Sequence, residues 1–449
     1  MVSAVLRSLK VTFRKLVLRL ALALWWPLAQ PCISQPDHAS PVEGPGPAVL
    51  TVDQAVAEAR EANPEIQTAV RRVALAQSKM ATARSLDDPM LMVRDWQTPL
   101  KKPWDLNQAQ LMFMVQQTFP NGEKRDMRAR LAGDNVEVAT EEVETLRQEV
   151  AAQVRKTCAD LKRNADALKV HDHQSALLKE ALSAAMAEYT TGKVPQADVL
   201  RAQIAVTKLN EHMIELEQER DSALAQLNAL LGRRADEPVE ISGTYATAVS
   251  VPAIDDLEQA AIEHRPELAA LRKQIATAQD ESHLARMALK PDFTVGLGYM
   301  LMPTGSTYRN AYMAEFSMNL PRWNRDRHES EAKQADAATA VTQSELDMRS
   351  NAAFLEVRQA QIDVLAAQKR VKLYRDTLLP QADAAFKAAT AAYQNNRAEF
   401  ASLIDSQNML LDIETALYTA EAAVDTGIAR LERATGTPLS QPDEKETRQ

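Results

Sequence analysis

The chain contains an internal repeat of about 200 residues, and this repeat limits what it can fold into more than any other feature. Five landmarks recur in the same order at nearly constant spacing: Asn63-Pro64-Glu65-Ile66 as Arg265-Pro266-Glu267-Leu268, Pro89 as Pro291, Phe119-Pro120 as Leu320-Pro321, Tyr189 as Tyr393, and Leu227…Gly232 as Leu431…Gly436. Two copies are too few for a solenoid, which needs at least three. The sequence therefore predicts a protomer with two similar halves, residues 49–241 and residues 242–438.

Each half is expected to be mainly helical. Only 12 of the 449 residues are Gly and 5% are aromatic, which favours long helices over an all-β sandwich or a Gly-rich nucleotide-binding fold. The 3.6-residue period of apolar side chains predicts matching helices in the two halves: 51–62, 65–86, 123–188 and one that ends at Gly232, then 255–264, 267–288, 326–392 and one that ends at Gly436. The two longest would measure roughly 100 Å at 1.5 Å per residue and would carry coiled-coil seams. Pro380 is expected to kink the second of them.

Before each long helix, the apolar period changes from 3.6 to 2. This change predicts strands within residues 90–119 and 292–320, each about 9–12 residues long, which is the length that crosses a bilayer as a tilted strand. One face of these strands is apolar, and the other is the expected wet, lumen-facing side, with Met112, Met114, Gln116, Met300 and Glu315. Four such strands cannot close a barrel, and an open sheet edge in lipid leaves backbone groups unsatisfied. We therefore expect the chain to share a barrel with copies of itself.

A tight turn separates each long helix from its return helix. The turns are expected at 189–199 and 393–403. Gly192 and Asn396 follow the two long helices, and both residue types accept the left-handed conformation that ends a helix. Asp198 either faces the tip of its hairpin or supports the first turn of the return helix.

The N-terminus is typical of a secretory signal peptide over residues 1–34. It has a basic start without acidic residues, a short apolar stretch from Leu20 to Ala29, and small residues around Cys32 and Ser34. Acylation of Cys32 is the alternative, although Ala29-Gln30-Pro31 is a poor lipidation motif. We expect a disordered linker over 35–48 and a flexible tail over 439–449.

Removal of residues 1–34 leaves an acidic chain. The signal carries five basic residues and no acidic one, so the net charge of −9 becomes −9 − 5 = −14. An acidic chain has no electrostatic reason to bind nucleic acid. Cys158 is then the single remaining cysteine, so an intramolecular disulfide cannot form.

Several short motifs, taken in order, resemble the TolC-type outer-membrane efflux family over nearly the whole mature length. The motifs are Asn63-Pro64-Glu65, Gln117-Thr118-Phe119-Pro120 with Gly122 and Lys124, Tyr189…Gly192…Asp198-Val199-Leu200, Leu378-Leu379-Pro380, Tyr393…Leu403-Ile404-Asp405, and Gly436 with Pro438. The resemblance implies a homotrimer that joins a 12-stranded β-barrel in outer-membrane lipid to a 12-helix α-barrel in the periplasm. It implies the exit duct of a tripartite efflux system, which passively conducts metal ions or drugs. The Leu-Leu-Pro and Gln-Thr-Phe-Pro motifs are most similar to those of the heavy-metal efflux subtype.

The same resemblance implies partners and a docking tip. A periplasmic adaptor would link the duct to an inner-membrane transporter. The adaptor would dock at the turns, on the residues Tyr189, Gly192, Asp198, Val199, Leu200, Tyr393, Asn396, Leu403 and Ile404.

The resemblance also implies a constriction near the second turn. The family has carboxylates nine and twelve residues after the tyrosine that corresponds to Tyr393, and these positions are Ser402 and Asp405 here. A threefold ring of Asp405 carboxylates would attract cations; an ordinary solvated helix carboxylate is the alternative. The family's basic latch position corresponds to Ala398, with Arg397 adjacent, so the closed-state lock differs.

No metal site, cofactor or catalytic site is expected. Thioethers are soft ligands for Cu(I) or Ag(I), but methionine also fills space, and tight binding would block a duct. The His171-Asp172-His173 segment looks like a metal cluster, yet residues two apart on a helix point about 200° apart, so we expect surface solvation. The sequence has no G-x-S-x-G, H-E-x-x-H, paired C-x-x-C or phosphate-binding Gly loop, so we do not expect an enzyme.

Two other functions are compatible with parts of the pattern. A periplasmic adaptor also has a signal peptide and a helical hairpin, but normally one hairpin within Gly-rich β domains. A coiled-coil scaffold of an export complex would not require strands with alternating faces. The duct is the interpretation that uses both repeats and all four strands.

Overall fold

The computed structural model describes residues 48–96, 105, 107–243, 245, 249–395 and 397–439, which belong to one compact unit. The expected signal peptide, nearly all of the 35–48 linker, Asn396 and the tail after Leu439 lie outside the described residues.

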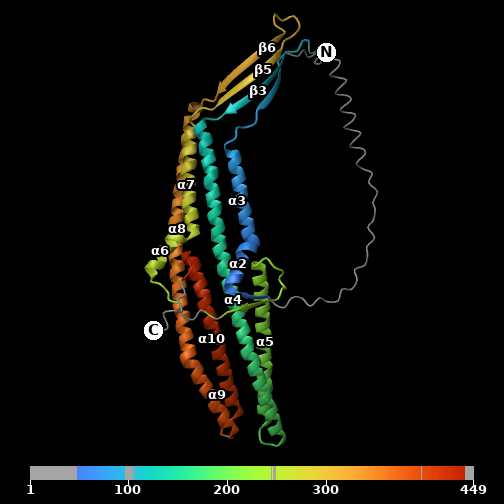
Figure 1. Cartoon of the computed structure of the whole chain (residues 1–449), viewed down its shortest axis with the longest axis vertical. Coiled ribbons are helices and arrows are strands. Elements are labelled where there is room, and N and C mark those ends of the chain that lie inside the picture. The colour runs from blue at the N-terminus through green and yellow to red at the C-terminus, as the bar shows by residue number, and fades with distance from the viewer. Residues whose placement is uncertain are drawn as a thin grey trace, which may run out of the picture. The chain divides into compact units, whose positions relative to one another are not determined.

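The order of elements predicted for each half is confirmed. The first half contains β1 (Ala48–Thr51), α2 (Val52–Ala62), α3 (Pro64–Ala83), β2 (Met90–Asp95), β3 (Leu111–Phe119), α4 (Gly122–Thr190), α5 (Gln196–Leu230) and β4 (Val239–Ser242). The second half contains α6 (Ile254–His264), α7 (Pro266–Met287), β5 (Phe293–Leu301), β6 (Asn310–Met318), η1 (Pro321–Asn324), α8 (Arg325–Leu373), η2 (Tyr374–Leu378), α9 (Leu379–Gln394) and α10 (Phe400–Thr435). Within this unit the strands β3, β5 and β6 lie at one end of the long helices and the hairpin turns at the other (Figure 1).

The repeated X-Pro-Glu motif begins the second helix of each half. Pro64 occupies the first turn of α3, where a missing N–H costs nothing. The Asn63 side chain accepts hydrogen bonds from the amides of Glu65 and Ile66 at 2.9 and 3.2 Å, and its own amide donates to the Leu230 carbonyl at 2.9 Å. In the second half, buried Arg265 replaces Asn63 and pairs with Glu267 and Glu356 instead.

The glycines that end the return helices occupy equivalent positions in the two halves. Gly232 and Gly436 have φ values of 70° and 75°, which only glycine adopts without strain. A Cβ at Gly232 would lie 2.7 Å from the Ala62 carbonyl oxygen, and one at Gly436 would lie 2.5 Å from the His264 carbonyl oxygen. Each glycine therefore lets a return helix end directly against the X-Pro step of its own half.

Replacement of Gly436 by Ala is expected to destabilise the protein by about 1–3 kcal/mol, because it combines a positive φ with a backbone clash. Thermal unfolding of the purified protein measures the loss. Gly192 also has a positive φ, 73°, but nothing lies within 4 Å of its missing Cβ, so Gly192→Ala is the matched control and should cost less. Equal losses would show that the close approach to His264 contributes nothing.

The four predicted strands form one antiparallel sheet in the order β2-β3-β5-β6. The central pair joins the two halves, since Leu111–Phe119 aligns with Phe293–Leu301 along its whole length. A second, parallel sheet pairs β1 with β4 and was not predicted; it also shows that the 35–48 linker ends in a strand at Ala48. Four-residue strands are too short to show a period of two.

The second long helix is interrupted before Pro380, as expected. The interruption is a change of helix type and not a bend within a continuous α-helix. A π-helical turn, Tyr374–Leu378, separates α8 from α9. Proline has no N–H to donate, so the preceding turn widens. Figure 1 shows α9 leaving the line of α8 at this point.

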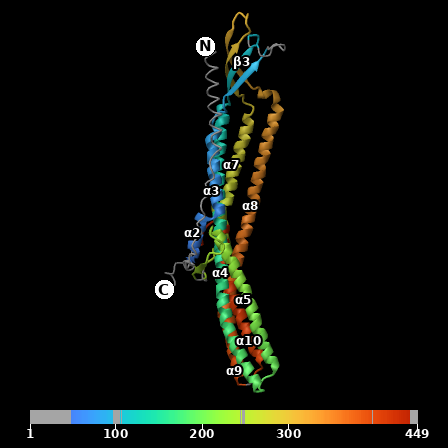
Figure 2. The same cartoon turned by 90° about the vertical axis from the view of Figure 1, so that its right-hand side faces the viewer.

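The apolar seam predicted on the first long helix is confirmed. Val150, Val154 and Cys158 of α4 are buried against α2, α3 and α5. The second half has an equivalent cluster around Val357 and Leu431. Figure 2 shows α4, α5, α9 and α10 together below this level. None of the helices in the described residues has the apolar length that a bilayer crossing requires.

Candidate functional site

The two hairpin turns form the far end of the helical part. Helix α4 ends in a left-handed turn at Gly192, as predicted, and the amides of Gly192 and Lys193 donate to the carbonyls of Tyr189 and Glu188, both at 2.9 Å. The Asn396 cap predicted for α9 lies outside the described residues. The tip thus consists of two short connections, one between α4 and α5 and one between α9 and α10.

The tip has an apolar core that includes three residues predicted to dock an adaptor. Val199, Leu403 and Ile404 are each 8% exposed and pack with Phe400. These three side chains therefore contribute to packing within the tip, while adaptor docking itself stays a prediction. Tyr189 and Leu200, at 45% and 49% exposed, remain available. The sequence could not separate the two groups, because every helix at the tip carries apolar residues on more than one side.

Tyr393 connects the two hairpins. Its hydroxyl donates to the Glu188 carboxylate at 3.3 Å, and its ring lies edge-on to Phe400 with centroids 5.5 Å apart. Burial, followed by the nearby Glu188 charge, raises the pKa of the Tyr393 hydroxyl. A neutral donor is therefore held against a carboxylate at the junction of α9 with α4.

The constriction candidates lie on the exposed side of α10. Ser402 and Asp405 are both exposed and sit one turn apart. Asp412 is seven residues beyond Asp405, so the two carboxylates share one helix face. Asp198 differs from them: its side chain is 15% exposed and lies 3.7 Å from Arg201, which supports its role in the first turn of α5.

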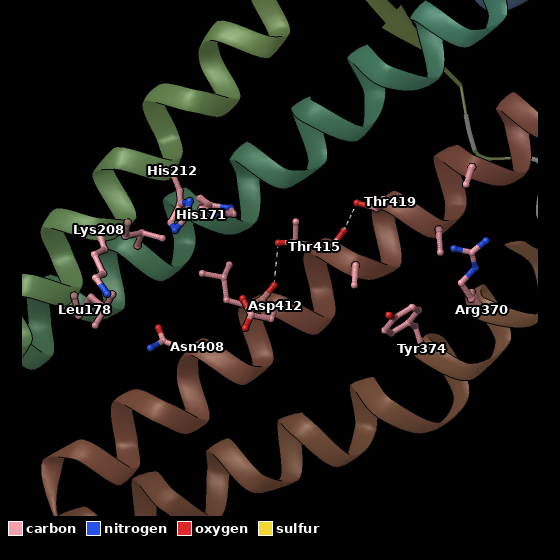
Figure 3. A pocket seen from close by; sticks show the side chains of 16 residues that line it. His171, Leu178, Lys208, His212, Arg370, Tyr374, Asn408, Asp412, Thr415 and Thr419 are labelled. Carbon is pink, nitrogen blue, oxygen red and sulfur yellow. Dashed lines mark hydrogen bonds between the residues drawn. The ribbon is translucent and has the colours of Figure 1, made fainter.

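A cavity of about 710 Å³ opens on this same stretch of α10, between α4, α5 and the π turn (Figure 3). Its polar lining comes from His171, Lys208, His212, Arg370, Tyr374, Asn408, Asp412, Thr415 and Thr419. The imidazoles of His171 and His212 lie edge-to-face, with ring centroids 6.4 Å apart.

The structure corrects the prediction for His171. Asp172 and His173 are exposed, but His171 is only 5% exposed, so it is not a solvated surface side chain. The helical geometry used to reject a His171-Asp172-His173 cluster holds, since the neighbours point elsewhere. His212, which contacts His171 from α5, was missed because the two residues are 41 positions apart (212 − 171). Within the described ranges, no group of three or more His, Cys, Asp or Glu side chains is arranged to hold a metal ion.

The sheet has two chemically different faces. On one face, the ladder rows are Met112–Met300, Met114–Gly298–Met313 and Gln116–Gly296–Glu315. Glu315 is exposed, but Met112 and Met114 are 2% and 1% exposed. These two predicted lumen-facing methionines are therefore packed within the chain, where the missing side chains of Gly296 and Gly298 leave room for Met114.

The other face of the sheet is apolar and exposed. Leu297 is 67% exposed and Val115 51%, and they lie in one ladder row. Aromatic pairs stand on either side of that row: Tyr299 with Tyr312, and Phe293 with Phe316. An aliphatic band between two aromatic rows is the pattern of a lipid-facing barrel wall.

The comparisons with known proteins agree with one another. The model of the outer membrane efflux protein family matches residues 55–233 and 257–437. The chain is 24% identical over 432 residues to the cobalt-zinc-cadmium resistance protein CzcC of Cupriavidus metallidurans, with 93% of this chain and 100% of that protein covered. Its fold is similar to that of the outer membrane protein VceC of Vibrio cholerae, with a TM-score of 0.72, 16% identity, and 87% and 97% of the two chains covered. It is also similar to CusC, with a TM-score of 0.74, 15% identity, and coverage of 86% and 92%.

Proposed function

This chain belongs to the outer membrane efflux protein family, and on that premise we propose that three copies of it form a continuous exit duct from the periplasm through the outer membrane. The observation that carries the proposal is the four-stranded sheet, which has an exposed apolar face and whose two edge strands have no second partner among the described residues. Strand β2 at one edge and β6 at the other each pair with a single neighbour.

The sheet cannot remain open in lipid. Unpaired backbone groups at the edges of β2 and β6 would cost several kcal/mol each in hydrocarbon. Pairing β6 of one copy with β2 of the next removes both edges, and three copies supply twelve strands. The polar and methionine-bearing face, with Gln116, Met300 and Glu315, then lines the lumen.

The helices also require neighbours. Helix α8 presents Val341, Met348, Leu355 and Ile362 at 58%, 59%, 58% and 52% exposure. These residues are seven apart, so they form one apolar stripe along the helix. A second copy covers this stripe in the proposed trimer, which makes the periplasmic part a closed ring of helices.

The cargo proposed for the duct is metal cations or drugs, with a preference for cations at the tip. The relative CzcC is named for resistance to cobalt, zinc and cadmium. Asp405, repeated three times around the axis, gives the entrance a negative field. Selection and energy come from an inner-membrane transporter through a periplasmic adaptor, which docks on the exposed tip residues Tyr189 and Leu200.

Purified protein without residues 1–34, reconstituted in planar bilayers, is expected to conduct and to prefer cations over anions. Asp405→Asn should lower the cation-to-anion permeability ratio several-fold, measured from reversal potentials in a salt gradient. Asp198→Asn is the matched control, because Asp198 is a tip carboxylate that pairs with Arg201. Absence of conductance in a folded trimer would refute the duct, and an unchanged ratio in Asp405→Asn would refute the constriction.

The two other functions considered from the sequence, an adaptor and a coiled-coil scaffold, do not explain the exposed apolar face of the sheet. An adaptor or a coiled-coil scaffold would work in water, where the exposed rows around Leu297 and Phe316 would promote aggregation. Neither accounts for an aliphatic band between aromatic rows.

A further inference from the structure

Two histidines in the cavity beside α10 are arranged like metal ligands. A carbonyl oxygen only accepts hydrogen bonds, so the contact of 2.8 Å between His171 Nδ1 and the Ala167 oxygen fixes the proton on Nδ1. In the neutral ring, Nε2 of His171 then carries the free lone pair. On α5, His212 Nδ1 lies 3.4 Å from the Glu215 carboxylate, and both side chains are exposed.

The His171 contact is typical of histidines that bind metals, which hold a ligating nitrogen in place by bonding the other nitrogen to a carbonyl or carboxylate. The ring separation also fits. Zinc binds imidazole nitrogen at about 2.0–2.1 Å, so two rings that share one tetrahedral ion have centres roughly 5–6 Å apart. The observed 6.4 Å needs a small rotation of His212, whose side chain is 59% exposed and free to move toward buried His171.

We propose that His171 and His212 form a weak binding site for a divalent metal ion of the zinc type, with water completing the coordination. Imidazole favours such borderline ions over Mg²⁺ or Ca²⁺. Two protein ligands give weak binding, which suits a transit site, because a strongly bound ion would not leave a duct. That the site lies on the conduit rests on the proposed function: Asp412 lines this cavity and shares a helix face with Asp405.

Charged side chains around His171 and His212 are expected to change the affinity of the site for a cation. The titratable groups that line the cavity beside the histidines are Lys208, Arg370, Tyr374 and Asp412. Lys208 is one turn from His212 on α5, and its positive charge opposes cation binding. The Asp412 carboxylate on α10 favours it.

Zinc chloride titrated into the metal-free trimer in detergent at pH 7.5, followed by competition with a metallochromic indicator, tests the site. His212→Gln should weaken binding at least tenfold, and Lys208→Gln should strengthen it several-fold. His173→Gln, an exposed histidine two residues along α4, is the matched control and should leave binding unchanged.

An unchanged affinity in His212→Gln, or an equal loss in His173→Gln, would overturn the site. The test uses no variant of buried His171. His212 and Lys208 are exposed, so their substitutions should leave the fold intact. Conductance separates this inference from the proposed function. A trimer that conducts but shows no zinc binding dependent on His212 refutes only the metal site, and a protein that binds zinc but does not conduct refutes only the duct.

Discussion

Arginine in place of Leu297 is expected to prevent stable insertion of the protein into the outer membrane. Leu297 is 67% exposed at the centre of β5, and its row continues through Val115 and Ala314. A charged side chain on the lipid face of a barrel costs about 2–4 kcal/mol near the bilayer midplane. The proposed trimer carries three copies of the substitution, so the total cost is roughly three times larger. The amount of trimer extracted by detergent from the outer-membrane fraction measures the effect.

Glu315→Arg provides the matched control at nearly the same depth. Glu315 follows Ala314 on β6, so its side chain is on the opposite face of the sheet, and it is already charged and exposed. Its replacement should leave insertion intact. If Glu315→Arg blocked insertion while Leu297→Arg did not, the two faces would be assigned the wrong way round, and the lumen positions of Gln116 and Met300 would be wrong with them.

The sequence predicted the sheet because its strands carry a strong local signal. Alternation over nine residues in β3 and β5 marks both the strands and their faces, and the ladder places Phe113 with Tyr299 and Met112 with Met300 as the alternation requires. Short elements carry no such signal, so β1 and β4 were missed. Their pairing depends on residues almost 200 positions apart, such as Val49 and Glu240.

Contacts between helices were harder to predict than the helices themselves. The seam on α4 was predictable from spacing, but the spacing does not say which helix covers it. The burial of Val199, Leu403 and Ile404 and the contact of His171 with His212 both arise from packing between hairpins. The homotrimer, the adaptor contact and the Asp405 constriction remain predictions, because they concern surfaces that another chain must complete.

An ion pair at the junction between helices and sheet gives a physical role to Lys124, which belongs to one of the motifs that carry the family resemblance. Lys124 lies in the first turn of α4 and is 6% exposed. Its ammonium donates to both oxygens of Asp292 at 2.9 and 3.1 Å and to the Lys290 carbonyl at 2.7 Å. Asp292 also accepts from the Asn121 amide at 3.0 Å. The pair therefore joins the two halves of the chain at the helix-proximal ends of β3 and β5.

Asp292→Ala is expected to destabilise the protein by about 3–5 kcal/mol, because it leaves a buried ammonium without its counter-charge. Denaturant unfolding in detergent measures the change. The double variant Lys124→Met/Asp292→Leu should recover most of the loss, since an apolar pair of similar volume removes both desolvation costs. Arg84 and Asp126 form an exposed pair nearby, with side chains 69% and 66% exposed, so Asp126→Ala should cost less than about 1 kcal/mol. A loss in Asp292→Ala no larger than in Asp126→Ala would mean that water reaches Lys124 and that the junction is held by the β3–β5 ladder alone.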